Sequence, residues 1–377
     1  MTKVLFLVTG LHAGGAERML AKLVRQLVAK GMTVEVVSLT SGGIVAAEFV
    51  DIGVPVHSLG FERPWRMPGG LYVLARLLRR FRPDVIQGWM YHANLLALLG
   101  RFMAAGRPRL YWGIRQSLTD LGREKPGTRL VIRLGALMSH WIDGIVYNSE
   151  LARRQHESAG YFPRHSKLID NGFETTEFIP DRRCYCKIRE ELGFPETAFV
   201  IGVVARNHPV KGYEHIMPAA TRMVAMYEDV CFVFVGGGVS EDSATFKGWI
   251  GAQSDSSRYR LLNEVADVRC ITAAFDVATS ASIAEAFPNA VGEAMSCGVP
   301  CVATDVGDVR RLVGDCGVIV EPANPWALLE GWRLLRDMPA AERAMLGERA
   351  RERICRHFSM EHVGGQYASL YMEKHDG

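Results

Sequence analysis

The sequence VLFLV at residues 4–8 is an uninterrupted apolar run that leads directly into the glycine-containing loop 9–15. The next segment is amphipathic, and the apolar run 34–39 follows it. Strand, loop, helix and strand at this length predict a βαβ unit of a parallel sheet. The strands are apolar at almost every position, which indicates burial on both faces of the sheet. The predicted inner face of the helix carries Met19, Leu20, Leu23 and Leu27.

A second copy of this plan begins with FVIGVV at residues 199–204. It continues through the loop 205–212 and a helix near 213–227 to the apolar run 231–235. The chain has 377 residues, which at ~150 residues per domain corresponds to two domains or slightly more. Each copy is therefore expected to begin its own doubly wound α/β domain. Further strands are predicted at 84–88, 109–112, 145–147, 275–279 and 300–304.

The domain boundary is predicted in the polar, turn-rich run 170–196. We expect an N-terminal domain over residues 1–175 and a C-terminal domain over residues 190–358. The final segment, 359–377, has a helical pattern of apolar residues. It is expected to cross back onto the first domain.

The composition, with 48% hydrophobic and 23% charged residues, is that of a globular protein. No apolar run approaches the ~18 residues that span a bilayer, and the first run is too short for a signal peptide. We therefore expect a cytoplasmic protein. All eight cysteines lie at or after Cys184, without the spacing of a zinc site, and are interpreted as buried free thiols. No Asp-x-Asp sequence occurs, so we expect no metal–diphosphate site.

Ligands of open α/β sheets bind beyond the carboxyl ends of the strands, at loops that lead into helices. This rule selects the loops 9–15, 205–212 and 280–289. In the first loop, Gly14 and Gly15 allow backbone N–H groups to approach a phosphate closely. A turn from strand to helix also uses glycine for steric reasons alone. The loop does not match the G-x-G-x-x-G fingerprint of dinucleotide-binding domains.

The loop 205–212 carries two cations five residues apart, Arg206 and Lys211. The guanidinium is a forked donor with a permanent charge, and the ammonium is a point charge on a flexible stem. Preorganised cations stabilise the negative charge that develops on a departing nucleoside diphosphate. The alternative interpretation is that both are solvated loop charges.

The sequence EAFPNAVGE at residues 285–293 places Glu285 just before a predicted helix and Glu293 about one turn inside it. Pro288 suits the first helical turn, whose N–H groups have no intrahelical partner. These N–H groups and the positive end of the helix dipole form an anion site. Carboxylates on either side suit a ligand with hydroxyls at both ends and phosphate between them, such as a nucleotide-sugar. Backbone groups near Leu262 are candidates to pair with the edge of the base.

With these motifs the sequence resembles the family 4 glycosyltransferases, which have the GT-B fold. The resemblance covers nearly the whole chain. Its specific part is an Arg-x4-Lys sequence at 206–211 followed by a Glu-x7-Glu sequence at 285–293. The other matching positions are Gly14-Gly15, Asn148-Ser149, Asn171-Gly172, Gly212, 282–289, 293–300 and 314–317.

The resemblance implies two facing Rossmann-like domains with a cleft between them. It also implies a retaining transfer from a nucleotide-diphospho-sugar, with UDP as the commonest nucleotide and without metal or cofactor. The leaving phosphate itself would take the proton of the acceptor. Arg206 and Lys211 would neutralise the diphosphate, Glu285 would bind sugar hydroxyls and Glu293 would bind the ribose. Gly15 and the backbone of Phe287, Pro288 and Asn289 would also contact the donor.

One position departs from the family pattern. Many members carry a histidine after the fourth strand of the first domain, facing the sugar, and this chain has Arg115 there. An arginine cannot act as a base at neutral pH, so Arg115 is expected to steady the diphosphate or to bind an anionic acceptor. His92, after an adjacent strand, is a second acceptor-side candidate, although a single histidine is more often structural.

The two halves of the chain differ in charge. Residues 1–180 hold 23 Lys+Arg against 14 Asp+Glu, and residues 181–377 hold 21 against 27. The basic half predicts an anionic partner, which for this fold is an acceptor or an anionic membrane surface, not a nucleic acid. A solvated helix face is the alternative. The basic residues surround an amphipathic helix at 71–78 with Trp65 and Met67 before it, and they comprise Arg63, Arg66, Arg76, Arg79, Arg80, Arg82, Arg101, Arg107, Arg109, Arg123, Lys125, Arg129 and Arg133.

The function that the sequence favours is transfer of a sugar to a glycan or lipid-linked acceptor, in surface polysaccharide or oligosaccharide assembly. A sugar-nucleotide epimerase of GT-B-like fold is the main alternative, since it shares the domains and the donor but lacks the two spaced motifs. Incubation with the donor alone separates the two, because an epimerase needs no acceptor. A nicotinamide-dependent dehydrogenase is disfavoured by the missing glycine fingerprint.

Overall fold

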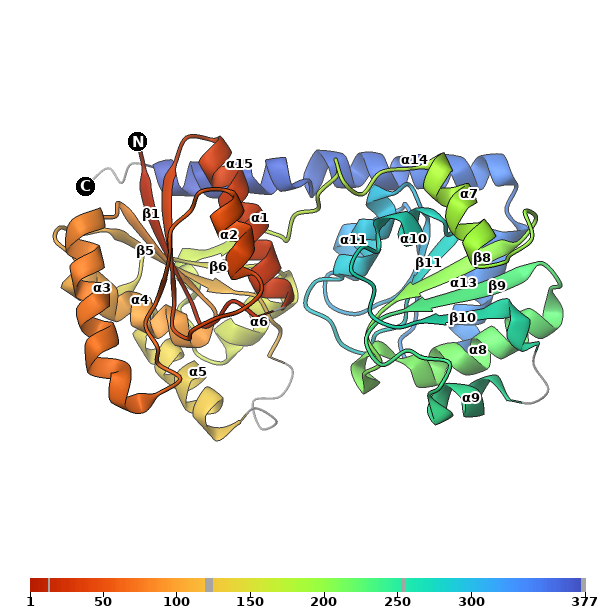
Figure 1. Cartoon of the computed structure of the whole chain (residues 1–377), viewed down its shortest axis with the longest axis horizontal. Coiled ribbons are helices and arrows are strands. Elements are labelled where there is room, and N and C mark those ends of the chain that lie inside the picture. Colours follow the sequence, from red (N-terminus) through yellow and green to blue (C-terminus); the bar gives the residue numbers. More distant parts are fainter. Residues whose placement is uncertain (13, 119–124, 252–254, 374–377) are drawn as a thin grey trace. The chain divides into compact units, whose positions relative to one another are not determined.

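The computed structural model describes every residue except 13, 119–124, 252–254 and 374–377. Arg123, one of the basic residues named above, lies outside the described residues. The chain forms two compact units (Figure 1). Unit 1 comprises Met1–Gly172 and the segment from Met360 onward, and unit 2 comprises Phe173–Ser359.

The described strands of unit 1 form one parallel sheet of seven, in the order β3-β2-β1-β4-β5-β6-β7. Its first strand, Lys3–Val8, pairs with β2 on one side and β4 on the other. The strands are β1 Lys3–Val8, β2 Thr33–Ser38, β3 Val56–Ser58, β4 Val85–Trp89, β5 Arg109–Ile114, β6 Gly144–Tyr147 and β7 Ser166–Leu168. The helices are α1 Gly15–Ala29, α2 Ala46–Asp51, η1 Pro64–Arg66, α3 Met67–Phe81, α4 Tyr91–Met103, α5 Pro126–Met138, η3 Ser139–Trp141, α6 Glu150–Ser158, η4 Pro163–His165 and α15 Met360–Met372.

The described strands of unit 2 form a parallel sheet of six, in the order β10-β9-β8-β11-β12-β13. The strands are β8 Phe199–Val204, β9 Val230–Val235, β10 Tyr259–Leu262, β11 Val277–Ser280, β12 Cys301–Thr304 and β13 Val318–Val320. The helices are α7 Arg182–Glu191, η5 Pro209–Lys211, α8 Tyr213–Met226, α9 Ala244–Ile250, η6 Ser256–Arg258, α10 Arg269–Ala273, α11 Asn289–Ser296, α12 Val309–Val313, α13 Pro325–Asp337 and α14 Ala340–His357.

Hydrophobic periodicity predicted the central elements of both units correctly. The four residues assigned to the inner face of α1 are all buried, because α15 and the sheet cover that face. The β8 strand and the start of α8 lie where the sequence placed them. The short edge strands β3, β7 and β13 were not predicted, since strands of three residues carry too little alternation to detect.

The run 170–196, predicted as a boundary, contains the helix α7. The Asp181 carboxylate caps this helix by accepting from the N–H groups of Arg183 and Cys184. The Arg189 guanidinium contacts the Asp276 carboxylate at 2.6 Å and donates to the carbonyls of Ala198 and Ala274. The part of the run from Phe173 onward therefore belongs to the packed body of unit 2.

One prediction about the cysteines is wrong. Cys184 on α7 and Cys270 on α10 form a disulfide, although 86 residues separate them in the sequence. Cys186 is exposed and Cys355 is half-buried, so neither is a buried thiol. The remaining thiols are buried and free, and burial raises the pKa of Cys297 and Cys301 to about 12.

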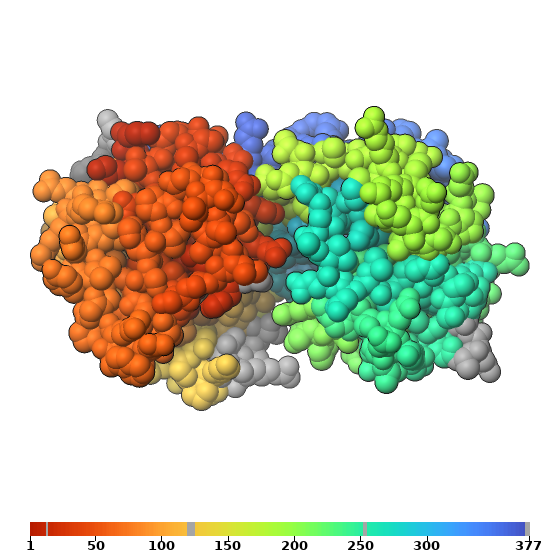
Figure 2. Space-filling view, in the orientation of Figure 1, coloured from red at the N-terminus to blue at the C-terminus, as the bar shows by residue number. Residues whose placement is uncertain are grey.

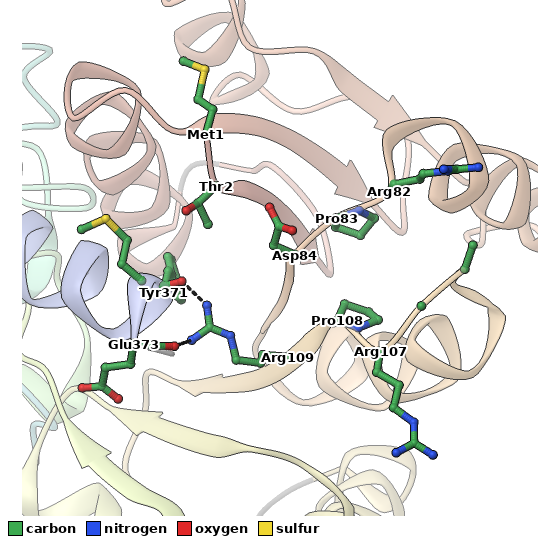
Figure 3. Close-up of a pocket in the computed structure, with 13 residues that line it drawn as sticks. Met1, Thr2, Arg82, Pro83, Asp84, Arg107, Pro108, Arg109, Tyr371 and Glu373 are labelled. Carbon is green, nitrogen blue, oxygen red and sulfur yellow. Dashed lines mark hydrogen bonds between the residues drawn. The ribbon is translucent and has the colours of Figure 1, made fainter. Parts of the chain in front are cut away.

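An open hollow of about 820 Å³ lies at the amino ends of β1, β4 and β5 (Figure 3). Arg109, at its edge, donates to the carbonyls of Leu370, Tyr371 and Glu373 and so ties α15 to β5. Arg82 and Arg107 point in different directions and do not converge on the hollow (Figure 3). This end of the sheet therefore anchors the C-terminal helix, and Arg109 is not part of an exposed basic surface.

The fold depends on a close contact at Gly292 on α11. A Cβ at this position would lie 2.0 Å from the ring of Phe173, which is buried in a hydrophobic core cluster of unit 2. Gly292→Ala is therefore expected to lower the melting temperature of the protein, with a loss of about 1–3 kcal/mol, because the ring has to move out of a packed core.

The matched control is Gly248→Ala on α9, where a Cβ would meet no atom within 4 Å. This variant is expected to melt at the wild-type temperature or slightly above it, since alanine favours helix. Equal melting temperatures for the two variants would contradict the packing described at Gly292.

Candidate active site

In unit 2 the loops that follow β8 and β11 are held against each other at the carboxyl edge of the sheet. The Ile283 N–H donates to the Val210 carbonyl at 2.9 Å. Gly212 has φ +69°, and a Cβ there would lie 2.1 Å from the Ala281 carbonyl oxygen. Only glycine combines this backbone conformation with so close an approach. The two loops that carry the predicted charges are therefore locked in a fixed relation.

Lys211 and Glu285 meet across this junction. The Lys211 ammonium contacts the Glu285 carboxylate, which also accepts from the Ser282 hydroxyl at 3.0 Å. The Ser282 carbonyl in turn accepts from the Thr304 hydroxyl at 2.6 Å, at the end of β12. The Lys211 and Glu285 side chains retain 25% and 19% of their exposure, so a ligand can reach both.

Arg206 is placed differently from Lys211. Its side chain is exposed and forms no ion pair within the described residues. Its backbone lies against Gly236, where a Cβ would be 2.2 Å from the Ala205 carbonyl oxygen. The next residue, Asn207, donates its N–H to the Gly237 carbonyl at 2.8 Å. The glycine turn after β9 thus supports the loop that carries Arg206, whose charge is available to a ligand.

The α11 helix begins at Asn289, so Pro288, which was predicted in the first helical turn, is its N-cap. The Phe287 side chain is buried and stacks on Phe173 with ring centroids 6.0 Å apart, so only its backbone is available to a ligand. At the start of the helix the Asn289 N–H donates to the Phe287 carbonyl at 3.1 Å, and the Gly292 N–H donates to the Pro288 carbonyl at 3.3 Å. Asn289 is exposed at this turn, and Glu293 is half-buried one turn further along.

Leu262 ends β10, which is the edge strand of the sheet. Its carbonyl already accepts from the Gly236 N–H at 3.0 Å. A base at this edge therefore has only the second lone pair of that oxygen available to it.

In unit 1 the loop after β1 leads to α1, with Gly14 as the N-cap. The Gly14 N–H donates to the His12 carbonyl at 2.8 Å. The Glu17 carboxylate lies beside Gly14, since a Cβ on Gly14 would be 2.0 Å from one of its oxygens. A carboxylate is favourable at a helix N-terminus, but a phosphate that binds at Gly14 and Gly15 has to approach beside it.

The turn after β4 carries local backbone strain. Met90 has φ +74°, which is unusual for a residue with a side chain. The turn is held by Asn94, whose Oδ1 accepts from the Gly113 N–H at 3.3 Å. It places His92 at the first turn of α4 with an exposed side chain. The strain at Met90 had no signal in the sequence.

Arg115 is almost completely buried in unit 1. It follows the fifth strand of the unit, because β3 adds a strand, and only 8% of the residue is exposed. Its guanidinium stacks on Trp89, 4.2 Å from the ring centroid, and donates from Nη1 to the Ile169 carbonyl at 3.3 Å. The Nε and Nη2 atoms have no hydrogen-bond partner. Arg115 is thus packed between Trp89 and Tyr367 of α15, and its predicted role toward the donor or the acceptor stays a prediction.

Several residues of the site were missed by sequence reasoning. Ser282 and Thr304 position Glu285, and Gly236 supports Arg206, but each is an ordinary residue type at its position. Among the described residues, no group of three or more His, Cys, Asp or Glu side chains has the arrangement of a metal site.

Profile comparisons divide the chain as the units do. The family described as Glycosyltransferase Family 4 matches residues 13–177, and the family described as Glycosyl transferases group 1 matches residues 198–337. The chain belongs to the family 4 glycosyltransferases.

Three relatives of this glycosyltransferase illustrate the range of the family. The D-inositol 3-phosphate glycosyltransferase of Salinispora arenicola is 30% identical over 56% of this chain and 50% of its own length. The N-acetyl-alpha-D-glucosaminyl L-malate synthase of Bacillus anthracis is 26% identical over 68% and 65%. The chain thus spans only half to two thirds of these relatives. A GDP-mannose-dependent phosphatidylinositol monomannoside mannosyltransferase of Corynebacterium glutamicum is 27% identical over 80% of both chains.

Solved structures establish the fold. The HepE protein of Anabaena in complex with UDP has a TM-score of 0.84 and 21% identity, covering 98% of this chain and 99% of its own. WaaG, a glycosyltransferase involved in lipopolysaccharide biosynthesis, has a TM-score of 0.72 and 14% identity, covering 98% and 100%. The glycosyltransferase therefore has two Rossmann-like domains of the GT-B type, as the sequence predicted.

Because Arg115 is buried, its replacement is expected to change the free energy of unfolding. Burial lowers the pKa of this guanidinium to about 9, an effect that the charges of Tyr371 and Asp170 oppose. Replacing a buried, partly unpartnered charge by an apolar side chain of similar length is often stabilising. Arg115→Met is therefore expected to raise the free energy of unfolding by about 1–3 kcal/mol.

The protonation state of Arg115 determines how the expected gain in the free energy of unfolding depends on pH. Below about pH 9 the guanidinium is charged in both the folded and unfolded chain, so the gain should be equal at pH 6 and pH 8. The exposed Arg25 on α1 supplies the control, since Arg25→Met should change stability by less than ~0.5 kcal/mol. A large loss of stability in Arg115→Met alone would show that the stacking on Trp89 outweighs the cost of burial.

Proposed function

We propose that this protein is a retaining glycosyltransferase that uses a nucleotide-diphospho-sugar, most simply a UDP-sugar, and glycosylates a glycan or lipid-linked acceptor. The observation that carries the proposal is the junction of Lys211 with Glu285 beside the exposed Arg206. These residues form the Arg-x4-Lys and Glu-x7-Glu motifs of the family, and they lie at the carboxyl edge of unit 2, where ligands of such sheets bind.

In this proposal the two cations bind the diphosphate, and Glu285 accepts hydrogen bonds from sugar hydroxyls. The contact between Lys211 and Glu285 supports a shared role, in which one ammonium serves both the sugar and its leaving group. Glu293 binds the ribose, and the backbone of Phe287, Pro288 and Asn289 faces the sugar or phosphate at the start of α11. Leu262 contacts the base through its backbone, and Gly14 and Gly15 are further proposed donor-binding residues.

The proposed reaction breaks the bond between the anomeric carbon and the diphosphate oxygen and forms the bond to the acceptor oxygen on the same face of the sugar. The acceptor proton passes to the departing phosphate, so no protein base is required. The charge that develops on the diphosphate is stabilised by Arg206 and Lys211 without a metal ion. On the acceptor side we propose His92, with Arg115 acting indirectly by holding Trp89.

Lys211→Ala is expected to lower kcat by about 10²–10³, because a preorganised charge at the leaving group is lost. The measurement is turnover of the donor with its acceptor. The control is Lys247→Ala on α9, which removes an exposed lysine of the same unit and should leave kcat unchanged. Wild-type turnover in Lys211→Ala would remove the proposed role of this residue.

The nucleotide is tested by thermal shift in a buffer that contains EDTA. UDP is expected to raise the melting temperature more than GDP, because a ligand that binds only the folded protein stabilises it. A larger shift with GDP would replace UDP in the proposal, and a shift abolished by EDTA would contradict metal independence. The anomeric proton of the product, observed by NMR, reports whether the configuration of the donor is retained.

A further inference from the structure

The η1–α3 segment of unit 1 presents apolar side chains to solvent. Trp65 is 75% exposed, Tyr72 is 69% exposed, and Met67 and Val73 are each exposed by more than 40%. Figure 2 shows this segment, in orange, at the surface of unit 1. The opposite face of α3 is buried against the sheet and α4. Its buried side chains are Leu74, Leu77, Leu78 and Phe81. The exposed apolar side chains therefore have no role in the core.

The same surface is strongly basic. Arg63, Arg66, Arg76 and Arg79 form no ion pair within the described part of the chain, and their side chains are exposed. Between residues 63 and 118 the sequence contains ten arginines and one acidic residue, Asp84. The nearest carboxylate before the segment, Glu62, accepts from the Ser41 N–H at 3.1 Å. Arg80 differs from the others, because it contacts the buried Glu35 carboxylate.

Aromatic and basic side chains are exposed together on α3, as on a helix that lies at a lipid interface. Tyr72, Arg76 and Arg79 follow at helical spacing and share one exposed face. Tryptophan and tyrosine are favoured at the level of lipid headgroups, and arginines interact with anionic headgroups. A solvated helix face would carry acidic residues among the arginines and would not expose a tryptophan and a tyrosine together.

We infer that the η1–α3 face docks the protein on an anionic lipid surface. Because α3 connects two parallel strands, it runs from the carboxyl edge of the sheet to the amino edge. Trp65 and the first turns of α3 therefore lie at the edge that also carries Gly14 and His92. Docking presents this edge to the lipid headgroups. That this brings a lipid-linked acceptor to the site rests on the proposed function, whereas the docking itself does not.

A second pair of exposed aromatic side chains lies away from the η1–α3 face and serves as a control for the docking experiment. Phe102 and Trp141 are 72% and 60% exposed at the amino-edge ends of α4 and η3. The nearby Arg101 is neutralised by Asp143 at 3.0 Å. This pair is also aromatic and exposed but lies at the opposite edge, so it should not contribute to docking.

The experiment is flotation of the full-length protein with vesicles of phosphatidylcholine alone or with 30–40% phosphatidylglycerol. Binding is expected only to the anionic vesicles, and it should fall as salt is raised. The double variant Trp65→Ser, Tyr72→Ser should bind at least about tenfold more weakly, because the buried apolar area is lost. Arg76→Ser, Arg79→Ser should weaken binding by about fivefold per arginine.

The matched variant Phe102→Ser, Trp141→Ser should bind like the wild type. No binding to anionic vesicles at low salt would overturn the inference, and so would loss of binding only in the matched variant. All the substituted residues are exposed, and unchanged melting temperatures verify that the variants fold. Flotation needs no nucleotide, so a negative flotation result contradicts only the lipid docking. The proposed use of a nucleotide-sugar is tested separately, by the thermal shift with UDP.

Discussion

The approach of Gly212 to the Ala281 carbonyl is the constraint on which the candidate site depends. It brings the loop after β8 against the loop after β11, two strands that are hydrogen-bonded neighbours in the sheet but separated by more than seventy residues in the sequence. With the loops in this relation, Lys211 and Glu285 meet without further adjustment. The charge arrangement of the site is thus a consequence of backbone packing.

The buried Ser282 and Thr304 hydroxyls beside the contact between Lys211 and Glu285 also help to fix the position of the carboxylate. Ser282 binds Glu285 and is itself held by Thr304 at the end of β12, so three adjacent strands share in placing one carboxylate. A group held from several elements loses little entropy when a ligand binds, which favours a preorganised site. Unit 1 differs in this respect, since its strained turn at Met90 leaves His92 exposed, while Arg115 is buried against Trp89.

Most of the fold was predictable, because parallel strands that are buried on both faces are read directly from apolar runs such as 4–8 and 199–204. The three-residue edge strands were not, and neither was the helix α7 within a polar run, since its stability comes from Asp181, Arg189 and Asp276 and not from periodicity. The disulfide between Cys184 and Cys270 had no local signal either. In the site, the spaced motifs were visible but the contacts of Ser282 and Gly236 were not.

The sequence by itself determined the two βαβ repeats, the loops that carry charge and the family, because all three are recorded in local spacing and residue type. Only the tertiary structure decided that Lys211 contacts Glu285, that Pro288 caps α11 and that Arg115 is buried on Trp89. These outcomes depend on which distant segments pack together. Burial and pairing are properties of that packing, and no single stretch of the chain contains them.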